Sequence, residues 1–191
     1  TFGAAAAEMR ITRHKMPSDR EGRSRYFASA VKLSVIDEYE TIFERFGWKA
    51  GLVLPRALSE SRWISADSEK ADSMLISAQS DGFSAILMRS GDPAVIRSVT
   101  CTLAERDDEI YRLLMFYNDR FAADSHDKLL ERILLIGKGL VPAKIRDIST
   151  EALGRALQVL RPEEVGLNMP ATSLTFDDIA APAGLAAFGW R

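Results

Sequence analysis

The residues with the clearest potential for chemistry are a glycine turn that carries a lysine, Gly137-Lys138-Gly139, after the apolar run Arg132 to Ile136. Glycine lets a backbone approach a phosphate closely, and a lysine ammonium can meet the phosphate's charge. The Gly-x4-Gly-Lys-Ser/Thr spacing of a phosphate-cradling loop is absent, however. Two interpretations stay open: a nucleotide contact, and a plain turn between a strand and a helix, which is the commoner use of such a pattern.

The other reactive residue types do not form a recognisable site. His14 and His126 are far apart in the sequence, and neither has a cysteine or carboxylate at metal-ligand spacing. Cys101 is the single cysteine, which excludes an intrachain disulfide and fits a reducing compartment. No Gly-x-Ser-x-Gly elbow is present. The sequence therefore predicts no catalytic residue and no metal site.

Two acidic clusters, Asp107-Asp108-Glu109 and Asp177-Asp178, could be mistaken for carboxylate sites. Each lies where a helix is expected to start. Acidic side chains complement the dipole at a helix N-terminus, at about 0.3–1 kcal/mol each. We therefore interpret both clusters as helix starts.

Two aromatic pairs, Tyr26-Phe27 and Phe46 with Trp48, allow two interpretations. Most such aromatics belong to a core. The alternative is that they line a groove for a partner's peptide.

Composition excludes several functional classes. The 191 residues are 47% hydrophobic and 27% charged, with a net charge of −2 and a pI near 5.8. These values give no pull toward nucleic acid or anionic lipid. No apolar run reaches membrane-spanning length and no signal peptide is visible, so we expect a cytoplasmic protein. Because the chain starts at Thr1 and an alanine run follows, we expect the natural protein to continue upstream.

The first part of the chain, residues 1–64, predicts the order ββαβα. Strands are expected over 9–16 and 26–31, and a helix with Ser34 as N-cap ends at Gly47. Asp37 and Glu38 would lie in its first turn. A short strand at Leu52–Leu54 and a helix from Pro55 to about Trp63 follow, and the polar segment 65–72 predicts a linker.

The remaining part, residues 73–191, predicts the order βββαβαβα. Three apolar runs separated by short polar turns predict an antiparallel meander. A helix from Asp107 to Phe121, a buried strand over 132–136 and a helix over 142–153 follow. A last strand over 156–160 and a small-residue helix from Pro182 to Trp190 complete this part. The fold class is α/β, with mixed sheets and helices on their faces.

This order of elements resembles the second lobe of actin-like ATPases. It is more similar still to the actin-like proteins of type IV pilus assembly (PilM-like) and to the cytoplasmic part of the type II secretion platform protein. The terminal helix with Ala183-Gly184-Leu185-Ala186-Ala187 is typical of them. Residues 8–63 resemble the insertion subdomain of that family, through the helix over 35–44 and the segment 51–55. The resemblance implies that a nucleotide-binding first lobe is missing from this chain.

The resemblance also identifies the positions of a nucleotide site and suggests that the site is degraded. Ser77 and Gln79 stand where the family has an Asp and a Gly after the apolar strand, and Asp81 and Gly82 restore that pair only if the turn slips. In the second turn Gly137 and Gly139 are kept, while Lys138 replaces a glycine. We therefore expect no cofactor, and ATP with magnesium only if the site is functional.

By resemblance, the protein is a non-catalytic scaffold of a type IV pilus or type II secretion inner-membrane platform. The implied partners are the short cytoplasmic tail of a single-pass membrane protein and the assembly ATPase. The protein would lie in the cytoplasm, peripheral to the inner membrane through those partners. Two alternatives stay open: an ATPase or phosphotransferase of the same fold, and a stand-alone domain of unrelated function.

Overall fold

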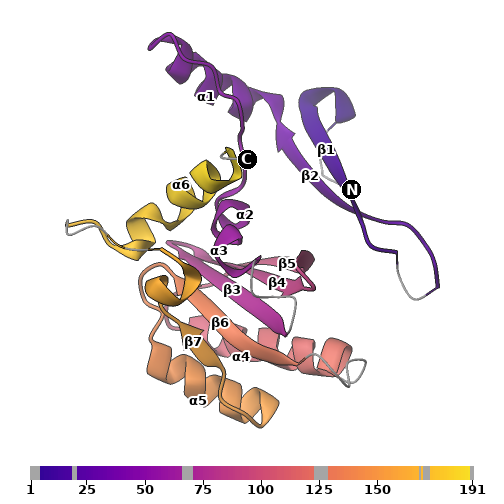
Figure 1. The fold of residues 1–191 in the computed structure, drawn as a ribbon, viewed down its shortest axis with the longest axis vertical. Coiled ribbons are helices and arrows are strands. Elements are labelled where there is room, and N and C mark those ends of the chain that lie inside the picture. The colour runs from indigo at the N-terminus through magenta and orange to yellow at the C-terminus, as the bar shows by residue number, and fades with distance from the viewer. Residues whose placement is uncertain are drawn as a thin grey trace. The chain divides into compact units, whose positions relative to one another are not determined.

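The computed structural model describes residues 5–18, 21–65, 71–122, 129–167, 169 and 173–189. The chain forms two compact units, Thr1–Leu54 and Pro55–Arg191 (Figure 1). We predicted a linker at 65–72, so the division falls earlier than expected. Residues 66–70 of that linker lie outside the described residues, as do His126 and Trp190.

Unit 1 contains a hairpin and a helix. A 3-10 turn, Ala6–Glu8, leads into β1 (Met9–Met16), which pairs antiparallel with β2 (Arg25–Lys32) from Met9 opposite Lys32 to Met16 opposite Arg25. Helix α1 (Leu33–Glu44) follows without a loop and buries Ile36. The predicted hairpin and helix are confirmed.

Three details of unit 1 differ from the prediction. Helix α1 begins at Leu33, after Lys32 and without a side-chain cap, so Ser34 lies inside its first turn and is not the N-cap. Because the helix starts earlier, its first turn contains no acidic residue. The predicted strand at Leu52–Leu54 is absent, because this apolar segment has no neighbouring strand to pair with among the described residues.

Unit 2 begins with two short helices and continues as the predicted series of strands and helices. The predicted order βββαβαβα is confirmed. Its elements are α2 (Arg56–Glu60), α3 (Arg62–Ser65), β3 (Asp72–Gln79), β4 (Gly82–Arg89), β5 (Asp92–Thr100), α4 (Arg106–Tyr117), η2 (Asn118–Ala122), β6 (Leu130–Ile136), α5 (Pro142–Leu153), β7 (Gln158–Leu160), η3 (Pro162–Val165) and α6 (Phe176–Gly189).

One mixed five-stranded sheet organises unit 2, in the order β5-β4-β3-β6-β7. Strands β3, β4 and β5 form the antiparallel meander, while β6 runs parallel to β3 and β7 parallel to β6. The carboxyl ends of β3, β6 and β7 therefore meet at one edge of the sheet. In open sheets of this kind, ligands bind beyond the carboxyl ends of parallel strands.

Helices cover both faces of the sheet, which explains why β3 and β4 are buried almost throughout. On one face, Met74 and Ile76 of β3 pack with Ile110 and Leu114 of α4 and with residues of α5. On the other face, Leu75 belongs to a cluster shared with α2, α3 and α6. In Figure 1, α4 and α5 lie on one side of the strands, and α2, α3 and α6 on the other.

Helix α6 begins at Phe176, before the predicted start at Pro182, which lies inside the helix. It packs closely on α2, since a Cβ added at Gly184 would lie 2.2 Å from the carbonyl oxygen of Ser59. The indole N–H of Trp63 donates to the carbonyl oxygen of Ala180 at 2.8 Å. Within the described part of the chain, no helix combines the length and apolar character needed to cross a bilayer.

Candidate functional site

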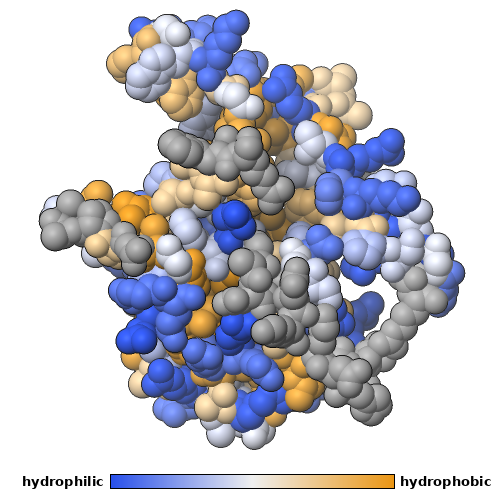
Figure 2. All heavy atoms as spheres, in the orientation of Figure 1, coloured by the Kyte–Doolittle hydropathy of each residue, from blue (hydrophilic) through white to orange (hydrophobic). Residues whose placement is uncertain are grey.

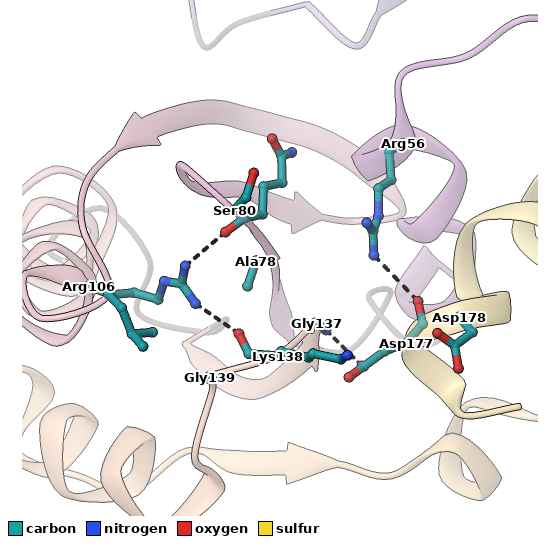
Figure 3. Close-up of a pocket in the computed structure, with 11 residues that line it drawn as sticks. Arg56, Ala78, Ser80, Arg106, Gly137, Lys138, Gly139, Asp177 and Asp178 are labelled. Carbon is teal, nitrogen blue, oxygen red and sulfur yellow. Dashed lines mark hydrogen bonds between the residues drawn. The ribbon is translucent and has the colours of Figure 1, made fainter. Parts of the chain in front are cut away.

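An open cavity of about 470 Å³ lies beyond the carboxyl ends of β3 and β6, at the edge where ligands of such sheets bind (Figure 3). The end of β3, the turn after β6, the start of α4 and the first turn of α6 all contribute to it. Its lining residues are Arg56, Ala78, Gln79, Ser80, Leu103, Arg106, Gly137, Lys138, Gly139, Asp177 and Asp178.

The glycine turn needs both of its glycines. Gly137 and Gly139 have φ angles of +102° and +82°, which side-chain-bearing residues rarely adopt. A Cβ on Gly137 would lie 2.7 Å from the carbonyl oxygen of Ala78, and one on Gly139 would lie 2.7 Å from Leu103 Cδ1. The glycines therefore let the turn after β6 lie against β3 and the segment before α4. This is a structural requirement that holds without a ligand.

Arg106, the first residue of α4, joins the two turns of the site. Its side chain is buried, with 3% of its surface exposed. Nη1 donates to the carbonyl oxygen of Lys138 and Nη2 to that of Gln79, both at 2.9 Å. In Figure 3 the guanidinium reaches from α4 to both backbones. A cation that could have met a phosphate is thus engaged with backbone carbonyls.

Asp177, in the first turn of α6, provides the anion that contacts the glycine turn. Its Oδ1 accepts a hydrogen bond from the backbone N–H of Gly137 at 2.7 Å. A phosphate oxygen bound at such a turn would accept from the same kind of N–H group. The carboxylate therefore takes the hydrogen bond that this N–H group could otherwise donate to a bound anion.

Charges of both signs alternate at the rim. The Thr175 hydroxyl donates to Asp178 at 2.7 Å and the Thr175 N–H at 2.9 Å, and with Lys138 nearby they lower the pKa of that carboxyl. Arg56 Nε donates to Glu60 at 2.7 Å, and its Nη2 to the Asp177 carbonyl oxygen at 3.5 Å. Lys138 is exposed, and no ion pair of its ammonium is found among the described residues. Its ammonium is the cation at the rim that is most accessible to an incoming anion.

The cavity brings together some of the predicted site residues and leaves out others. Gln79, Gly137, Lys138 and Gly139 line it. Ser77 is buried in β3, and its hydroxyl has no hydrogen-bond partner. Because residue 77 is a serine, no carboxylate is present at the position for which the resemblance implied an Asp.

Asp81 and Gly82 do not line the cavity, because the β3–β4 hairpin turns through two residues and leaves no room for the turn to slip. Gly82 instead allows close strand pairing, since a Cβ there would lie 1.9 Å from the carbonyl oxygen of Val99. The slipped turn on which restoration of the Asp-Gly pair depended is therefore not the turn seen in the structure.

The sequence prediction missed Arg56, Arg106 and Asp177 as residues of the site. One local signal was available. Thr175 and Asp178 have the spacing of a capping box, which would have placed the start of α6, and with it Asp177, at the cavity. No local signal indicates that Arg106 is buried across two distant turns.

A second candidate site is an apolar surface on unit 1, which we call the α1 stripe: Val35, Tyr39, Ile42, Phe43, Phe46 and Trp48. The residues within the helix recur at helical spacing on its solvent side, and each of the six is at least 36% exposed. Phe43 and Phe46 lie with ring centroids 6.4 Å and 5.8 Å from that of Trp48. We considered Phe46 and Trp48 as core or groove residues, and their exposure of 68% and 61% favours a groove.

Comparisons with known proteins identify the fold. No family model and no curated protein matches the sequence. Among solved structures, the chain is similar to a "PilM-PilN type IV pilus biogenesis complex" (TM-score 0.72, 14% identity, 98% of this chain and 68% of that one). It is also similar to a Bacteroides thetaiotaomicron protein with "actin-like ATPase fold and unknown function" (TM-score 0.53, 11% identity, 91% and 58%).

These likenesses extend over nearly the whole chain, although the identity is low. The chain spans 68% of the first of those structures and 58% of the second. The mixed sheet with helices on both faces agrees with them. The resemblance inferred from the sequence is confirmed at the level of the fold: this chain has the actin-like, PilM-like fold.

Proposed function

We propose that the protein is a non-catalytic actin-like scaffold of a type IV pilus or type II secretion inner-membrane platform, acting through protein contacts. The observation that carries this proposal is the hydrogen bond from Gly137 N–H to the Asp177 carboxylate. In this bond, the Asp177 carboxylate of the chain itself lies where relatives of this fold with ATPase chemistry need a phosphate.

Three further features of the cavity support the absence of catalysis. Ser77 provides no acid at the strand end, and Arg106 is held by the Gln79 and Lys138 carbonyl oxygens. In the described ranges, no three His, Cys, Asp or Glu side chains are grouped so that they could hold a metal ion. The missing acid at the strand end and the engagement of Arg106 with backbone carbonyls argue against binding of a magnesium–nucleotide complex.

The α1 stripe supports a role in binding a partner. A contiguous set of aromatic and aliphatic side chains that stays exposed on a soluble unit marks an interaction surface. The similar solved structure is a complex of PilM with PilN. By analogy, the partner is the short cytoplasmic tail of a single-pass, PilN-like membrane protein, which would hold this chain at the inner membrane from the cytoplasmic side. The assembly ATPase is a further partner on the same analogy.

Binding of a labelled tail peptide from the PilN-like protein of the same cell tests the partner. Fluorescence anisotropy should show saturable binding to the full chain. The double variant Phe46→Ser/Trp48→Ser should lose binding, since central aromatic anchors dominate such interfaces. Val141→Ser is the control, because Val141 is an exposed apolar residue of unit 2 that does not line the cavity. Equal loss in both variants would contradict the assignment to the stripe.

The alternative function, an ATPase or phosphotransferase, has one observation in its favour: an open cavity with the accessible cation Lys138 beside a glycine turn. Calorimetry and thermal unfolding with ATP and magnesium distinguish the two functions. A ligand at a hundred times its dissociation constant would add about 2.7 kcal/mol of stability. We expect neither a heat of binding nor a shift. Saturable binding with turnover would overturn the scaffold proposal, and binding without turnover would assign the nucleotide a structural role.

A further inference from the structure

The hairpin of unit 1 concentrates positive charge that the linear sequence spreads out. Strands β1 and β2 contain five arginines and lysines and no acidic residue: Arg10, Arg13, Lys15, Arg25 and Lys32. Helix α1, which follows directly, carries Asp37, Glu38, Glu40 and Glu44. Figure 2 shows strongly hydrophilic residues over much of the hairpin, at the right of the view. Unit 1 is thus divided into a basic ribbon and an acidic helix.

The cations of the ribbon gather on β1. Every residue from Arg10 to Lys15 is exposed, whereas β2 has only uncharged residues, Tyr26 to Val31, between its charged ends. Because side chains alternate along a strand, Arg10 lies on one face of the ribbon, where it comes within 4.0 Å of Glu40. Arg13 and Lys15 lie on the opposite face. The edge of β1 therefore presents a cation on each side.

That edge is also unpaired. The described residues place β1 and β2 in a sheet of two strands, so the outer N–H and C=O groups of β1 have no strand partner there. An isolated two-stranded hairpin is marginally stable, and an added strand would complete its hydrogen bonding. Cations on an edge normally prevent pairing with another strand. Here they repel a second copy of β1 and would attract a strand of opposite charge.

We propose that the outer edge of β1 binds an extended acidic segment of another protein by strand addition. Since cross-strand neighbours interact most strongly, carboxylates should stand opposite Arg10, Arg13 and Lys15. In a segment parallel to β1, the second carboxylate therefore follows the first by three residues, and the third follows by two more. In an antiparallel segment the intervals are two residues and then three. Among the strands that the structure describes, none has this acidic pattern, and the occupant that we propose is a segment of another protein.

Geometry favours a strand over an anionic bilayer as the occupant. A flat surface can meet only one face of the ribbon, and it would leave either Arg10 or the Arg13–Lys15 pair turned away. A strand beside β1 has side chains on both faces and meets all three cations. This edge shares no residue with the α1 stripe or with the cavity of unit 2. The test of strand addition and the test of the proposed function can therefore give different outcomes.

The test uses the full chain and labelled peptides of threonine and valine that carry glutamates at the two spacings. Fluorescence anisotropy at low salt should show binding of at least one peptide, and added salt should weaken it because exposed charges are screened. The variant Arg13→Ala/Lys15→Ala should weaken binding roughly tenfold. The matched control Arg45→Ala/Lys49→Ala removes the same charge from unit 1 outside the hairpin and should leave binding unchanged.

Two further measurements separate strand addition from simple charge attraction. A peptide of equal charge with prolines in place of the threonines lacks the N–H groups for pairing and should not bind. Amide hydrogen exchange should slow at those β1 N–H groups that point away from β2. Equal binding of the proline peptide, equal weakening by both double variants, or binding only to vesicles with anionic lipid would overturn the proposal.

Discussion

At each end of strands β3 and β6, a buried charged side chain connects the neighbouring elements. The two ends differ in how many polar atoms of that side chain have hydrogen-bond partners. At the amino ends, Asp72 accepts from Arg89 at 2.7 Å and from the Tyr117 hydroxyl at 3.2 Å. The same hydroxyl accepts from Leu130 N–H at 2.8 Å. At the carboxyl ends, Arg106 is bound only to backbone carbonyls, and its Nε has no hydrogen-bond partner.

The electrostatics agree with this difference. Hydrogen bonding to Asp72 raises the pKa of Arg89, and burial followed by the Asp72 charge raises the pKa of Tyr117. Opposite charges meet there in a closed network. At the carboxyl ends the charged groups face backbone, a glycine turn and an open cavity. The buried groups at the amino ends (the closed end) thus have charged or hydroxyl partners, whereas at the carboxyl ends (the open end) Arg106 and Asp177 bond to backbone groups beside an open cavity.

The largest expected effect comes from breaking the closed end with Asp72→Asn. The Asp72 carboxylate is fully buried and accepts hydrogen bonds from Arg89 and Tyr117, so neutralising it removes the ion pair and weakens these bonds. We expect a loss of about 3 kcal/mol in the free energy of unfolding. Urea denaturation measures it. Asp107→Asn is the matched control, since its ion pair with Lys144 is largely exposed to solvent and should contribute little to stability. Similar losses in both variants would contradict the structural role of the closed end.

A smaller loss is expected from Arg106→Met at the open end. The substitution keeps the buried stem but removes two hydrogen bonds to carbonyl oxygens, and it also removes the unsatisfied Nε. We expect a loss of about 2 kcal/mol, again by urea denaturation. Arg112→Met, on the same helix but exposed, should change stability little. A loss as large as that of Asp72→Asn would show that the two ends are equally stabilising.

The smallest effect concerns the rim of the open end and depends on pH. Because the pKa of Asp178 is lowered from 3.8 in the folded protein, its carboxylate contributes stability above that value, and the contribution disappears as pH falls through the lower, folded pKa. Thermal unfolding of the wild type and of Asp178→Asn should differ slightly at neutral pH and converge in acid. A difference that persists at the lowest pH would exclude the ionised carboxylate as its cause.

Local patterns predicted most of the fold. The meander β3–β5, the buried β6 and the helix α5, which ends at Gly154 with φ +68°, follow from periodicity and turn residues within short windows. The short apolar run Leu52–Leu54 misled the prediction, because a strand exists only where another strand can pair with it. That information is not local.

The site was predictable only in part for the same reason. The pattern Gly137-Lys138-Gly139 after an apolar run predicted a turn that needs glycine, and in the structure this turn lies at the cavity. Two other features depend on which helices pack on the sheet. Arg106 is buried across this turn, and Asp177 accepts a hydrogen bond from the turn. Charged residues are usually exposed, so a sequence gives no reason to expect them there.

The close packing of α6 on α2 has a mechanical consequence. The chain leaves unit 1 at Leu54 and enters unit 2 directly as α2. Any tension transmitted along the backbone from unit 1 therefore reaches α2 first, where Gly184 of α6 allows the two helix backbones to lie close together. Trp63 of the adjoining α3 donates a hydrogen bond to Ala180 of α6, so a pull on unit 1 would be passed to the terminal helix through these contacts.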